Sequence, residues 1–350
     1  MDLHQLLELT IQRNASDLHL VTGYYPTIRV DGELFSIRTA QLLTKEVAQQ
    51  IMFSMLSDEQ KENLLANKEI DMGYEYANTR FRVNVYSARG AYNASFRTIP
   101  ATIKTIEELG LPASFHHFKD FNNGLILVTG PTGEGKSTTI ASIINEINVN
   151  QSRHIITIED PIEYVYPPSK SIISQRELHE DTFSWNISLR SVLREDPDVV
   201  LVGEMRDYES TQHVLTIAET GHLVFSTLHT NSAPETINRI IDIFPSHQQN
   251  QIRTQLASVL KAVVSQKLLP RADVKGRIAA LELLYNNSAV SSLIREGKPY
   301  LLDNVMQTSE AEGFIYFEKY LAELYHQGKI SKDTAFAYAI RPKDLEKYLR

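Results

Sequence analysis

Apolar and polar positions change their periodicity along the chain and divide it into two regions. Up to residue 99, segments with helical spacing are mixed with segments of strand-like alternation, which is typical of a small α+β domain with a mostly antiparallel sheet. The spacing predicts helices over 3–13 and 44–66, and strands over 16–21, 27–30, 70–76, 80–88 and 92–99.

Beyond residue 112 the apolar residues form near-continuous runs separated by helical segments. Runs of this kind, rich in β-branched residues, are typical of a buried parallel sheet, so an α/β domain is predicted. Helices are predicted to dominate from residue 234 onward, ending in a helical region over 314–350. The predicted strands lie at 125–128, 154–158, 199–202, 223–227 and 277–284.

The segment 100–112 carries turn and breaker residues and few core-type runs. Segments with this composition commonly connect domains. The prediction is therefore an N-terminal domain over 1–99, a linker over 100–112, and a second domain over 113–350.

A glycine-rich turn follows the first apolar run of the second region and precedes a helix-compatible segment. Strand, glycine-rich turn and helix form the setting of a phosphate loop, in which backbone N–H groups and the helix N-terminus contact phosphate oxygens. Lys136 is expected to bind the β and γ phosphates, and the Ser137 hydroxyl to bind Mg²⁺. The chain is predicted to bind ATP or GTP through Gly130, Pro131, Thr132, Gly133, Glu134, Gly135, Lys136, Ser137 and Thr138.

The other three strands of this group are also followed by residues suited to phosphate chemistry. Glu159 and Glu163 follow the second run, Glu204 the third and His229 the fourth. Because the carboxyl ends of parallel strands meet at one edge of a sheet, these side chains are expected to converge on the phosphate loop.

Each of these side chains has a candidate role in phosphoryl transfer. Glu204 is expected to hold a metal or activate water, and Glu159 and Glu163 are candidates for binding Mg²⁺ or ordering water. His229 is expected to contact the γ-phosphate, and His222, beside Gly221, is a weaker candidate for nucleotide binding. The alternative is that the acids are solvated loop residues and the histidines are structural.

Phosphoryl transfer also needs positive charge at the transition state. Strand alternation places Arg80 and Arg82 on one face, and Arg97 lies on the next predicted strand. One interpretation is a solvated strand face. The other is a set of arginine fingers that reach a nucleotide bound by a neighbouring subunit, which requires an oligomer.

Composition excludes several other functions. The 350 residues include no cysteine, so a disulfide or a cysteine-ligated zinc site is impossible. The formal net charge of −8 argues against non-specific binding to nucleic acid or anionic lipid. No apolar run approaches the ~18 residues of a membrane span, and the N-terminus lacks the features of a signal peptide. A cytoplasmic protein is expected.

On these residues the chain resembles the type IV pilus retraction motors of the secretion ATPase superfamily, over essentially its whole length. Residues 80–84 and 96–100 are similar to the segments that carry the arginines of that family. Four further segments resemble its Walker A motif, Asp box, Walker B motif and His box, respectively 130–138, 157–163, 193–207 and 220–230.

The resemblance implies a PAS-like N-terminal domain and a RecA-like ATPase domain in a homo-hexameric ring. ATP hydrolysis with Mg²⁺ would drive pilus retraction and twitching motility. The implied partner is the pilus platform protein of the inner membrane, reached from the cytoplasmic face without membrane insertion. Family roles would make Glu204 the catalytic glutamate and Glu163 a second essential acid, with His229 near the γ-phosphate and Arg80, Arg82 and Arg97 acting in trans.

Two features of the chain favour retraction over assembly or secretion, and two depart from the family pattern. Assembly and secretion relatives usually have a longer N-terminus and commonly carry a four-cysteine zinc site. Position 134 is Glu where a small residue is usual, and this acid is expected to point outward. The C-terminal retraction signature corresponds to 289–296, where Ser291 and Ser292 replace Arg and Asn.

Several other functions therefore stay open. They are an accessory retraction motor, a type II secretion or pilus-assembly ATPase, a RecA-like motor on nucleic acid, and an adaptor that binds nucleotide without hydrolysing it. The acidic balance opposes direct binding of nucleic acid. The acids and the histidine around the expected γ-phosphate position favour hydrolysis.

Overall fold

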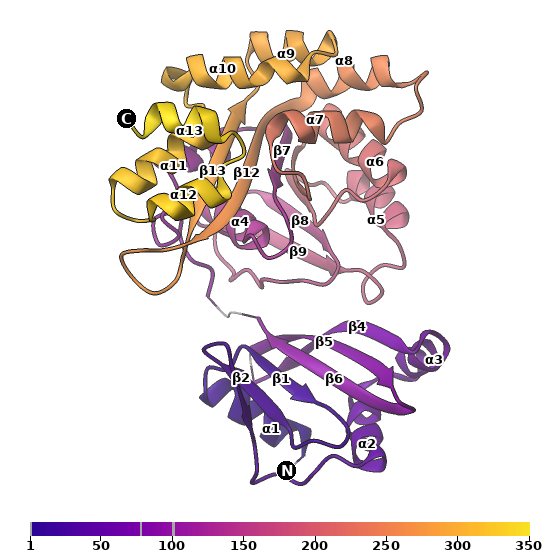
Figure 1. The fold of residues 1–350 in the computed structure, drawn as a ribbon. Helices are drawn as coiled ribbons and strands as arrows, with labels where there is room; N and C mark the ends of the chain where they lie inside the picture. The colour runs from indigo at the N-terminus through magenta and orange to yellow at the C-terminus, as the bar shows by residue number, and fades with distance from the viewer. Residues whose placement is uncertain (1, 78, 100–101) are drawn as a thin grey trace. The chain divides into compact units, whose positions relative to one another are not determined.

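The computed structural model describes residues 2–77, 79–99 and 102–350 (Figure 1). The chain forms two compact units, of which the first comprises the residues up to Thr102 together with Pro161–Val165. The second comprises Ile103–Asp160 and Tyr166–Arg350, so residues 103–112 of the predicted linker belong to it. Pro100 and Ala101, where the linker is predicted to begin, lie outside the described residues, as does Met1.

The first unit contains the predicted helices and strands with two differences: the predicted helix over 44–66 is two helices, α2 and α3, and the strand β3 was not predicted. Within the described residues its strands form a 6-stranded antiparallel sheet in the order β3-β2-β1-β6-β5-β4. The elements are α1 (Leu3–Gln12), β1 (Asp17–Leu20), β2 (Thr27–Val30), β3 (Glu33–Ser36), α2 (Lys45–Met55), α3 (Asp58–Asn67), β4 (Glu69–Tyr76), β5 (Thr79–Ala88) and β6 (Ala91–Thr98).

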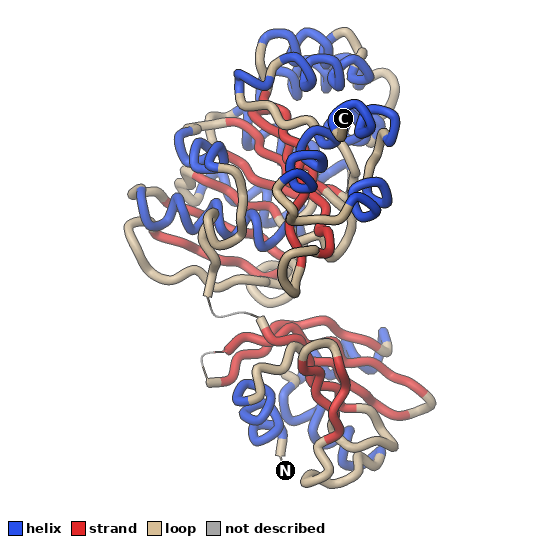
Figure 2. The backbone as a smooth tube through the Cα atoms, turned by 60° about the vertical axis from the view of Figure 1, so that its left-hand side comes forward, coloured by secondary structure: helices blue, strands red, loops and turns tan. Residues whose placement is uncertain are grey.

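One face of this sheet is apolar and shares a core with α1, α2 and α3, and Figure 2 shows these helices on one side of the strands. Along β5 the buried Phe81, Val83 and Val85 alternate with Arg80 and Arg82. Since strand side chains alternate between faces, the arginines lie on the face away from the core, as predicted.

The second unit is an α/β domain built on a mainly parallel sheet. In the part of the chain that the structure describes, this sheet is 7-stranded, in the order β13-β12-β7-β11-β10-β8-β9. Only β13 runs antiparallel to its neighbour. Its elements up to β11 are η1 (Ala113–Asp120), β7 (Gly124–Thr129), α4 (Lys136–Asn150), β8 (His154–Glu159), β9 (Ile172–Glu177), α5 (Trp185–Ser191), η2 (Val192–Arg194), β10 (Val199–Val202), α6 (Tyr208–Glu219) and β11 (Leu223–Leu228).

The C-terminal half of the second unit is mostly helical, as predicted, but it also supplies two long strands. Figure 1 shows α11, α12 and α13 gathered beside β12 and β13, in agreement with their contacts. The elements are α7 (Ala233–Asp242), α8 (Gln249–Val259), β12 (Leu260–Pro270), β13 (Arg277–Tyr285), α9 (Ser288–Arg295), η3 (Pro299–Leu301), α10 (Leu302–Thr308), η4 (Glu310–Glu312), α11 (Phe317–His326), α12 (Lys332–Tyr338) and α13 (Pro342–Tyr348).

In the second unit the sequence pattern missed β9 and β12. β12 mixes short apolar runs with Lys261, Gln266 and Lys267, and such runs do not distinguish a strand from a buried helix. The strand forms because β7 pairs with it on one side and β13 on the other. Tertiary pairing therefore decides the structure of this segment.

The central strands of the second unit are covered on both faces. Every residue of β7 and β11 is buried, and side chains alternate between the faces of a sheet. One face packs against residues of α5 to α10 in a single core, and α4 packs against β7. Among the described residues, no helix has the length and apolar character of a membrane span.

We expect Phe225→Ala to lower the free energy of unfolding of the second unit by about 3–5 kcal/mol, because it removes a fully buried ring from β11. The control is Tyr300→Ala, since Tyr300 is 67% exposed and its loss should cost about 0.5 kcal/mol or less. Urea denaturation followed by the fluorescence of Trp185, the single tryptophan, measures both. Equal losses would contradict this account of the core.

Candidate functional site

The phosphate loop connects β7 to α4, as the sequence predicts. Gly135 is the N-cap residue of α4, with φ of 80°. Gly130 has φ of 145°, and a Cβ atom there would lie 2.4 Å from the carbonyl oxygen of Gln266. Positive φ disfavours L-residues, and at Gly130 the backbone of β12 leaves no room for a side chain. The loop therefore needs both glycines to bring its N–H groups to the helix N-terminus.

β12 supports the loop, and sequence reasoning missed this support. Gln266 Nε2 donates to the Glu134 carbonyl oxygen at 2.6 Å, and Thr139 Oγ1 donates to Gln266 Oε1 at 2.7 Å. The Glu134 carboxylate accepts a hydrogen bond from the backbone N–H of Leu268. Glu134 thus does not simply point outward, because its carboxylate is bound to β12. No local signal predicts these contacts, since Gln266 lies 132 residues after Glu134 and 127 residues after Thr139 in the sequence.

Lys136, His229 and Glu204 form one continuous set of contacts at the carboxyl edge of the sheet. Lys136 Nζ donates to the carbonyl oxygens of Gly130 at 2.6 Å and Pro131 at 3.0 Å, and lies 3.4 Å from His229 Nδ1. On the other side of the imidazole ring, His229 Nε2 lies 3.1 Å from Glu204 Oε1. The predicted convergence of the ends of β7, β10 and β11 is therefore present.

The contacts of His229 assign the roles of its ring nitrogens. The Lys136 ammonium group carries only donors, so Nδ1 accepts its hydrogen bond. The ring proton then lies on Nε2, from which it is donated to the Glu204 carboxylate. The ring connects the cation of the phosphate loop to the carboxylate that follows β10.

The Glu204 carboxylate is also held by a second group of contacts. Its Oε2 accepts a hydrogen bond from Arg206 Nε at 3.0 Å, and Arg206 lies 3.8 Å from Asp160 Oδ2. This bond to Glu204 is the chief reason that the pKa of Arg206 is raised. Thr227 Oγ1 donates to the Gly203 carbonyl oxygen at 2.6 Å, which joins the ends of β10 and β11. With 21% of its side chain exposed, Glu204 is fixed but accessible.

Glu159 is the last residue of β8 and lies at the same edge. Its Cα atom would be 3.5 Å from a Cβ atom placed on Gly203, the residue before Glu204. Gln175 Nε2 lies 3.4 Å from Glu159 Oε1 and orients it from β9. Glu159 is therefore a neighbour of the Lys136, His229 and Glu204 contacts.

Two other predicted residues are not part of this edge of the second unit. Glu163 lies in the segment Pro161–Val165, which belongs to the first unit, so its role stays a prediction. His222 precedes β11 and therefore lies at the opposite end of that strand from His229. Its Nδ1 lies 3.1 Å from the carbonyl oxygen of Ile217, in a local structural contact. As a correction to the sequence-based expectation, we leave His222 out of the nucleotide site.

The three predicted arginines lie together on one sheet face of the first unit. Pairing places Arg82 directly opposite Arg97 on β6, and Arg97 directly opposite Asp17 on β1. Asp17 binds Arg97 at 3.0 Å, and Asp71 binds Arg82 at 3.1 Å. Arg80 precedes Arg82 by two residues on the same face of β5. The convergence of the arginines is thus observed, and their approach to a nucleotide stays a prediction.

A cavity of about 450 Å³ opens beside the phosphate loop in the second unit. Gly135, Thr138 and Thr139 form its wall on the loop side, and residues within 104–111 form another wall. Charged side chains of both signs line it, namely Lys104, Arg271, Arg277 and Lys329 together with Glu107 and Glu108. The cavity adjoins the helix N-terminus and has the size of a small-molecule site.

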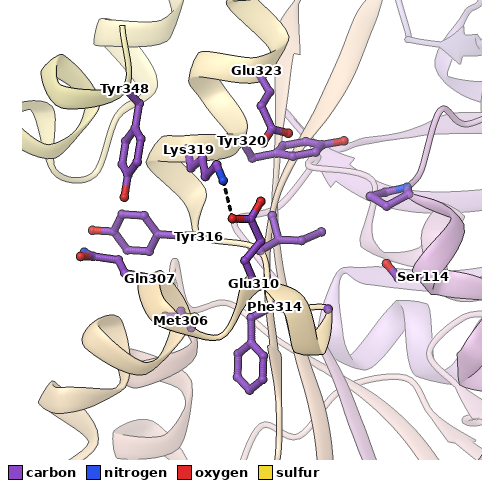
Figure 3. Close-up of a pocket in the computed structure, with 13 residues that line it drawn as sticks. Ser114, Met306, Gln307, Glu310, Phe314, Tyr316, Lys319, Tyr320, Glu323 and Tyr348 are labelled. Carbon is purple, nitrogen blue, oxygen red and sulfur yellow. Dashed lines mark hydrogen bonds and ion pairs between the residues drawn. The ribbon is translucent and has the colours of Figure 1, made fainter. Parts of the chain in front are cut away.

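A separate cavity of about 280 Å³ lies among the C-terminal helices (Figure 3). Tyr316, Tyr320 and Tyr348 line it together with the ion pair between Lys319 and Glu310. None of the residues that line it comes from the phosphate loop or from the ends of β8, β10 and β11. It is not part of the candidate site.

We expect Gly130→Ala to weaken binding of a fluorescent ATP analogue by about tenfold or more, because the added methyl group displaces the loop from β12. Gly221→Ala is the matched control. Gly221 also has positive φ, 101°, but nothing lies within 4 Å of an added Cβ, so this change should cost only about 1–2 kcal/mol of stability. Titration of both variants, with thermal melting alongside, measures the difference. Equal affinities would contradict the steric role of Gly130.

Comparisons with known proteins agree with this geometry. A family model described as type II/IV secretion system protein matches residues 1–338. The type IV pilus retraction ATPase PilT of Pseudomonas aeruginosa is 42% identical over 345 residues, 98% of this chain and 100% of that protein. The type IV pilus ATPase PilU of the same organism is 36% identical over 346 residues, 99% of this chain and 90% of that protein.

A solved structure gives the same result for the fold. The crystal structure of the pilus retraction motor PilT with bound ADP has a TM-score of 0.92 and 44% sequence identity, and the match covers 99% of each chain. A mainly parallel sheet with a phosphate loop and an antiparallel N-terminal sheet are therefore features that this chain shares with ATPases. The chain belongs to the type II/IV secretion system protein family.

Proposed function

We propose that this chain is an ATP-hydrolysing motor that drives type IV pilus retraction, and with it twitching motility. The observation that carries the proposal is the contact series from Lys136 through His229 to Glu204 at the end of the phosphate loop. It joins a phosphate-binding cation, a γ-phosphate contact and a catalytic carboxylate. The similarity to PilT over the full chain supports the cellular role.

The residues present fit a triphosphate with Mg²⁺. The loop glycines and the N-terminus of α4 suit the phosphates, and Lys136 exchanges its bonds to loop carbonyl oxygens for phosphate oxygens. Among the described residues, no group of three or more His, Cys, Asp and Glu side chains could hold a metal by itself. Mg²⁺ typically binds substrate phosphates with only one or two protein ligands, here Ser137 and Glu159. When bound, it would neutralise charge on the phosphates.

The cavity beside the loop suits the nucleoside. It adjoins Gly135 and Thr138, next to the position of the phosphates, and part of its wall comes from residues 104–111. Its basic side chains, which include Arg271 and Arg277, suit the ribose and phosphate edge of the ligand. ATP is the proposed nucleotide because the related proteins are ATPases by name.

Glu204 is the proposed catalytic base. Its carboxylate orients the attacking water and accepts a proton as the water oxygen bonds to the γ-phosphorus and ADP leaves. His229 holds the carboxylate through Nε2 and lies beside Lys136, so it responds to the γ-phosphate. Glu163 remains a proposed second acid.

Arg80, Arg82 and Arg97 are proposed to complete the site of an adjacent subunit in a homo-hexamer. Arg82 and Arg97 are directly opposite each other on neighbouring strands, and like charges in this arrangement cost stability. Asp17 and Asp71 offset this cost, yet Arg97 remains 73% exposed. A partly exposed cluster of arginines is suited to an anion supplied from outside the unit.

The proposed partner is the pilus platform protein of the inner membrane, approached from the cytoplasmic face. An accessory role like that of PilU is the second candidate, because the retraction signature is changed at Ser291 and Ser292. In the structure the Ser291 hydroxyl is bound to Asn286 Oδ1 at 2.9 Å and to the Ala257 carbonyl oxygen at 3.1 Å. Complementation of a strain that lacks its retraction motor, with and without its accessory motor, distinguishes the two roles.

We expect Lys136→Ala to abolish both ATP binding and hydrolysis, because it removes the cation of the phosphate loop. Glu204→Gln should bind ATP with near-parent affinity but hydrolyse it about 10²-fold or more slowly. Phosphate release and nucleotide titration measure the two effects, with the exposed Lys275→Ala as a control. Turnover at the parent rate by Lys136→Ala or Glu204→Gln would overturn the assignment of the site.

A mixture of Arg82→Ala and Lys136→Ala subunits should recover activity if sites are shared. A pocket is complete only where its loop comes from an Arg82→Ala subunit and its arginine from a Lys136→Ala subunit, so about a quarter of the pockets in a random 1:1 mixture are complete. The control mixture combines Arg82→Ala with the Arg82→Ala and Lys136→Ala double variant, which completes none. A lack of recovery at every ratio, or full activity of a monomer, would exclude catalysis in trans.

A further inference from the structure

Glu282 on β13 is a buried carboxyl group that the site described above does not include. Its side chain is fully buried, and Oε1 accepts a hydrogen bond from the backbone N–H of Ala233 at 2.6 Å. Ala233 is the first residue of α7. The first N–H groups of a helix have no partner within the helix, so Glu282 caps α7 from a strand that lies 49 residues further along the chain.

The capped helix follows His229 directly, and the intervening residues are held in place. Thr230 Oγ1 lies 2.6 Å from Thr236 Oγ1, and the Asn231 N–H donates to Glu235 Oε2 at 2.8 Å. Both contacts tie the segment after His229 to the first turn of α7. A shift of the start of α7 therefore shifts His229 relative to Lys136 and Glu204.

Glu282 also lies within a cluster of charged groups from the C-terminal elements. Arg341, before α13, binds Asp303 of α10 at 2.5 Å, and its backbone N–H donates to the buried Glu318 of α11 at 2.8 Å. Burial is the main cause that raises the pKa of Glu282; Arg341 lowers this pKa, and Asp303 and Glu318 raise it. Lys267 of β12 interacts with Glu282 and Glu318. Glu282 thus contacts α7 directly and α10, α11 and α13 electrostatically.

The protonation of Glu282 follows from its surroundings. Burial is the main cause that raises its pKa, to about 7, and Oε2 has no hydrogen-bond partner among the described residues. One guanidinium and one ammonium group face three carboxyl groups, so the neutral form of Glu282 is favoured below pH 7. A neutral carboxyl group still accepts the Ala233 hydrogen bond.

We propose that Glu282 is a positioning residue for ATP hydrolysis, which fixes the start of α7 and through it the place of His229 beside Glu204 and Lys136. The inference rests on the proposed function. It assigns the positioning effect to the hydrogen bond between Glu282 and Ala233 at the start of α7.

The test compares two variants of Glu282. Glu282→Gln keeps the shape of the side chain and an oxygen that can accept the Ala233 hydrogen bond, whereas Glu282→Met has a similar length but no such oxygen. Glu282→Met should speed amide hydrogen exchange over residues 229–237 about tenfold without nucleotide, and lower kcat about tenfold with KM within about twofold of the parent. Glu282→Gln should match the parent in both measurements. Asp303→Asn is the control, because it disturbs the same charged cluster but leaves the hydrogen bond between Glu282 and Ala233 intact, and it should change neither.

Several results would overturn the proposal. They are a folded Glu282→Met protein with parent exchange and parent kcat, or an equal loss of kcat in Asp303→Asn. If Glu282→Met does not fold, Ala233→Pro removes the same hydrogen bond from the donor side, at a helix position that tolerates proline. Parent kcat in a folded Ala233→Pro protein would also exclude the role. If the parent itself does not hydrolyse ATP, the proposed function fails, while hydrogen exchange still tests whether Glu282 fixes the start of α7.

The ionisation of Glu282 provides an independent check on its environment. Its pKa in the folded protein, about 7, lies above the ordinary 4.5. The stability that its neutral form contributes is therefore complete below pH 4.5 and is lost as the pH rises through about 7. Between about pH 4.5 and about pH 7, the melting temperature of the parent should fall more than that of Glu282→Gln, which cannot ionise. Parallel curves would show that Glu282 is not buried as described.

Discussion

The parallel pairing of β7, β11 and β10 is the constraint on which the site depends. The register aligns the last residues of β7 and β11, Thr129 and Leu228, and aligns the last residue of β10, Val202, with Ser226. The segments after these strands therefore begin at one edge, and Lys136, Glu204 and His229 come within hydrogen-bonding distance although 93 residues separate the first from the last. The segments after these strands meet because the strands pair in register, and contacts within each segment would not bring them together.

This edge concentrates charge that the rest of the fold must hold in place. Lys136 is bound by loop carbonyl oxygens and by His229, while Glu204 is bound by His229 and Arg206. Lys136 and Glu204 are therefore partly desolvated but paired, and the pairing offsets the free-energy cost of burying their charges. A bound substrate would compete for the same hydrogen-bond partners. The strand ends supply the groups, and their mutual pairing keeps them oriented.

Two groups of charged side chains outside this edge are arranged in ways that do not stabilise the fold. In the first unit Arg82 lies directly opposite Arg97 across β5 and β6, so two like charges are neighbours. In the second unit Asp303 and Glu318 of the C-terminal elements interact with the buried Glu282. Both arrangements cost stability, which is typical of functional rather than structural positions. The first is consistent with the proposed role of the arginines at the site of an adjacent subunit, and the second with the proposed role of Glu282 at the start of α7.

The amino-acid sequence by itself determined the features that depend on local chemistry. The glycines of the loop, the strand alternation around Arg82 and the apolar runs of β7, β8, β10 and β11 follow from backbone and side-chain preferences over a few residues. They were sufficient to predict the α/β fold, the phosphate loop and the convergence of Glu204 and His229. His222 was misplaced because a short motif does not say at which end of a strand a residue functions.

Only the tertiary structure decided the contacts between distant segments. β12 becomes a strand because β7 and β13 flank it, and it then binds Glu134 and Gln266 against the loop. The cap that Glu282 gives to α7 joins residues with no common local pattern. Pairing and capping of this kind depend on which backbone groups the folded chain leaves without partners, and this cannot be read from any short stretch of sequence.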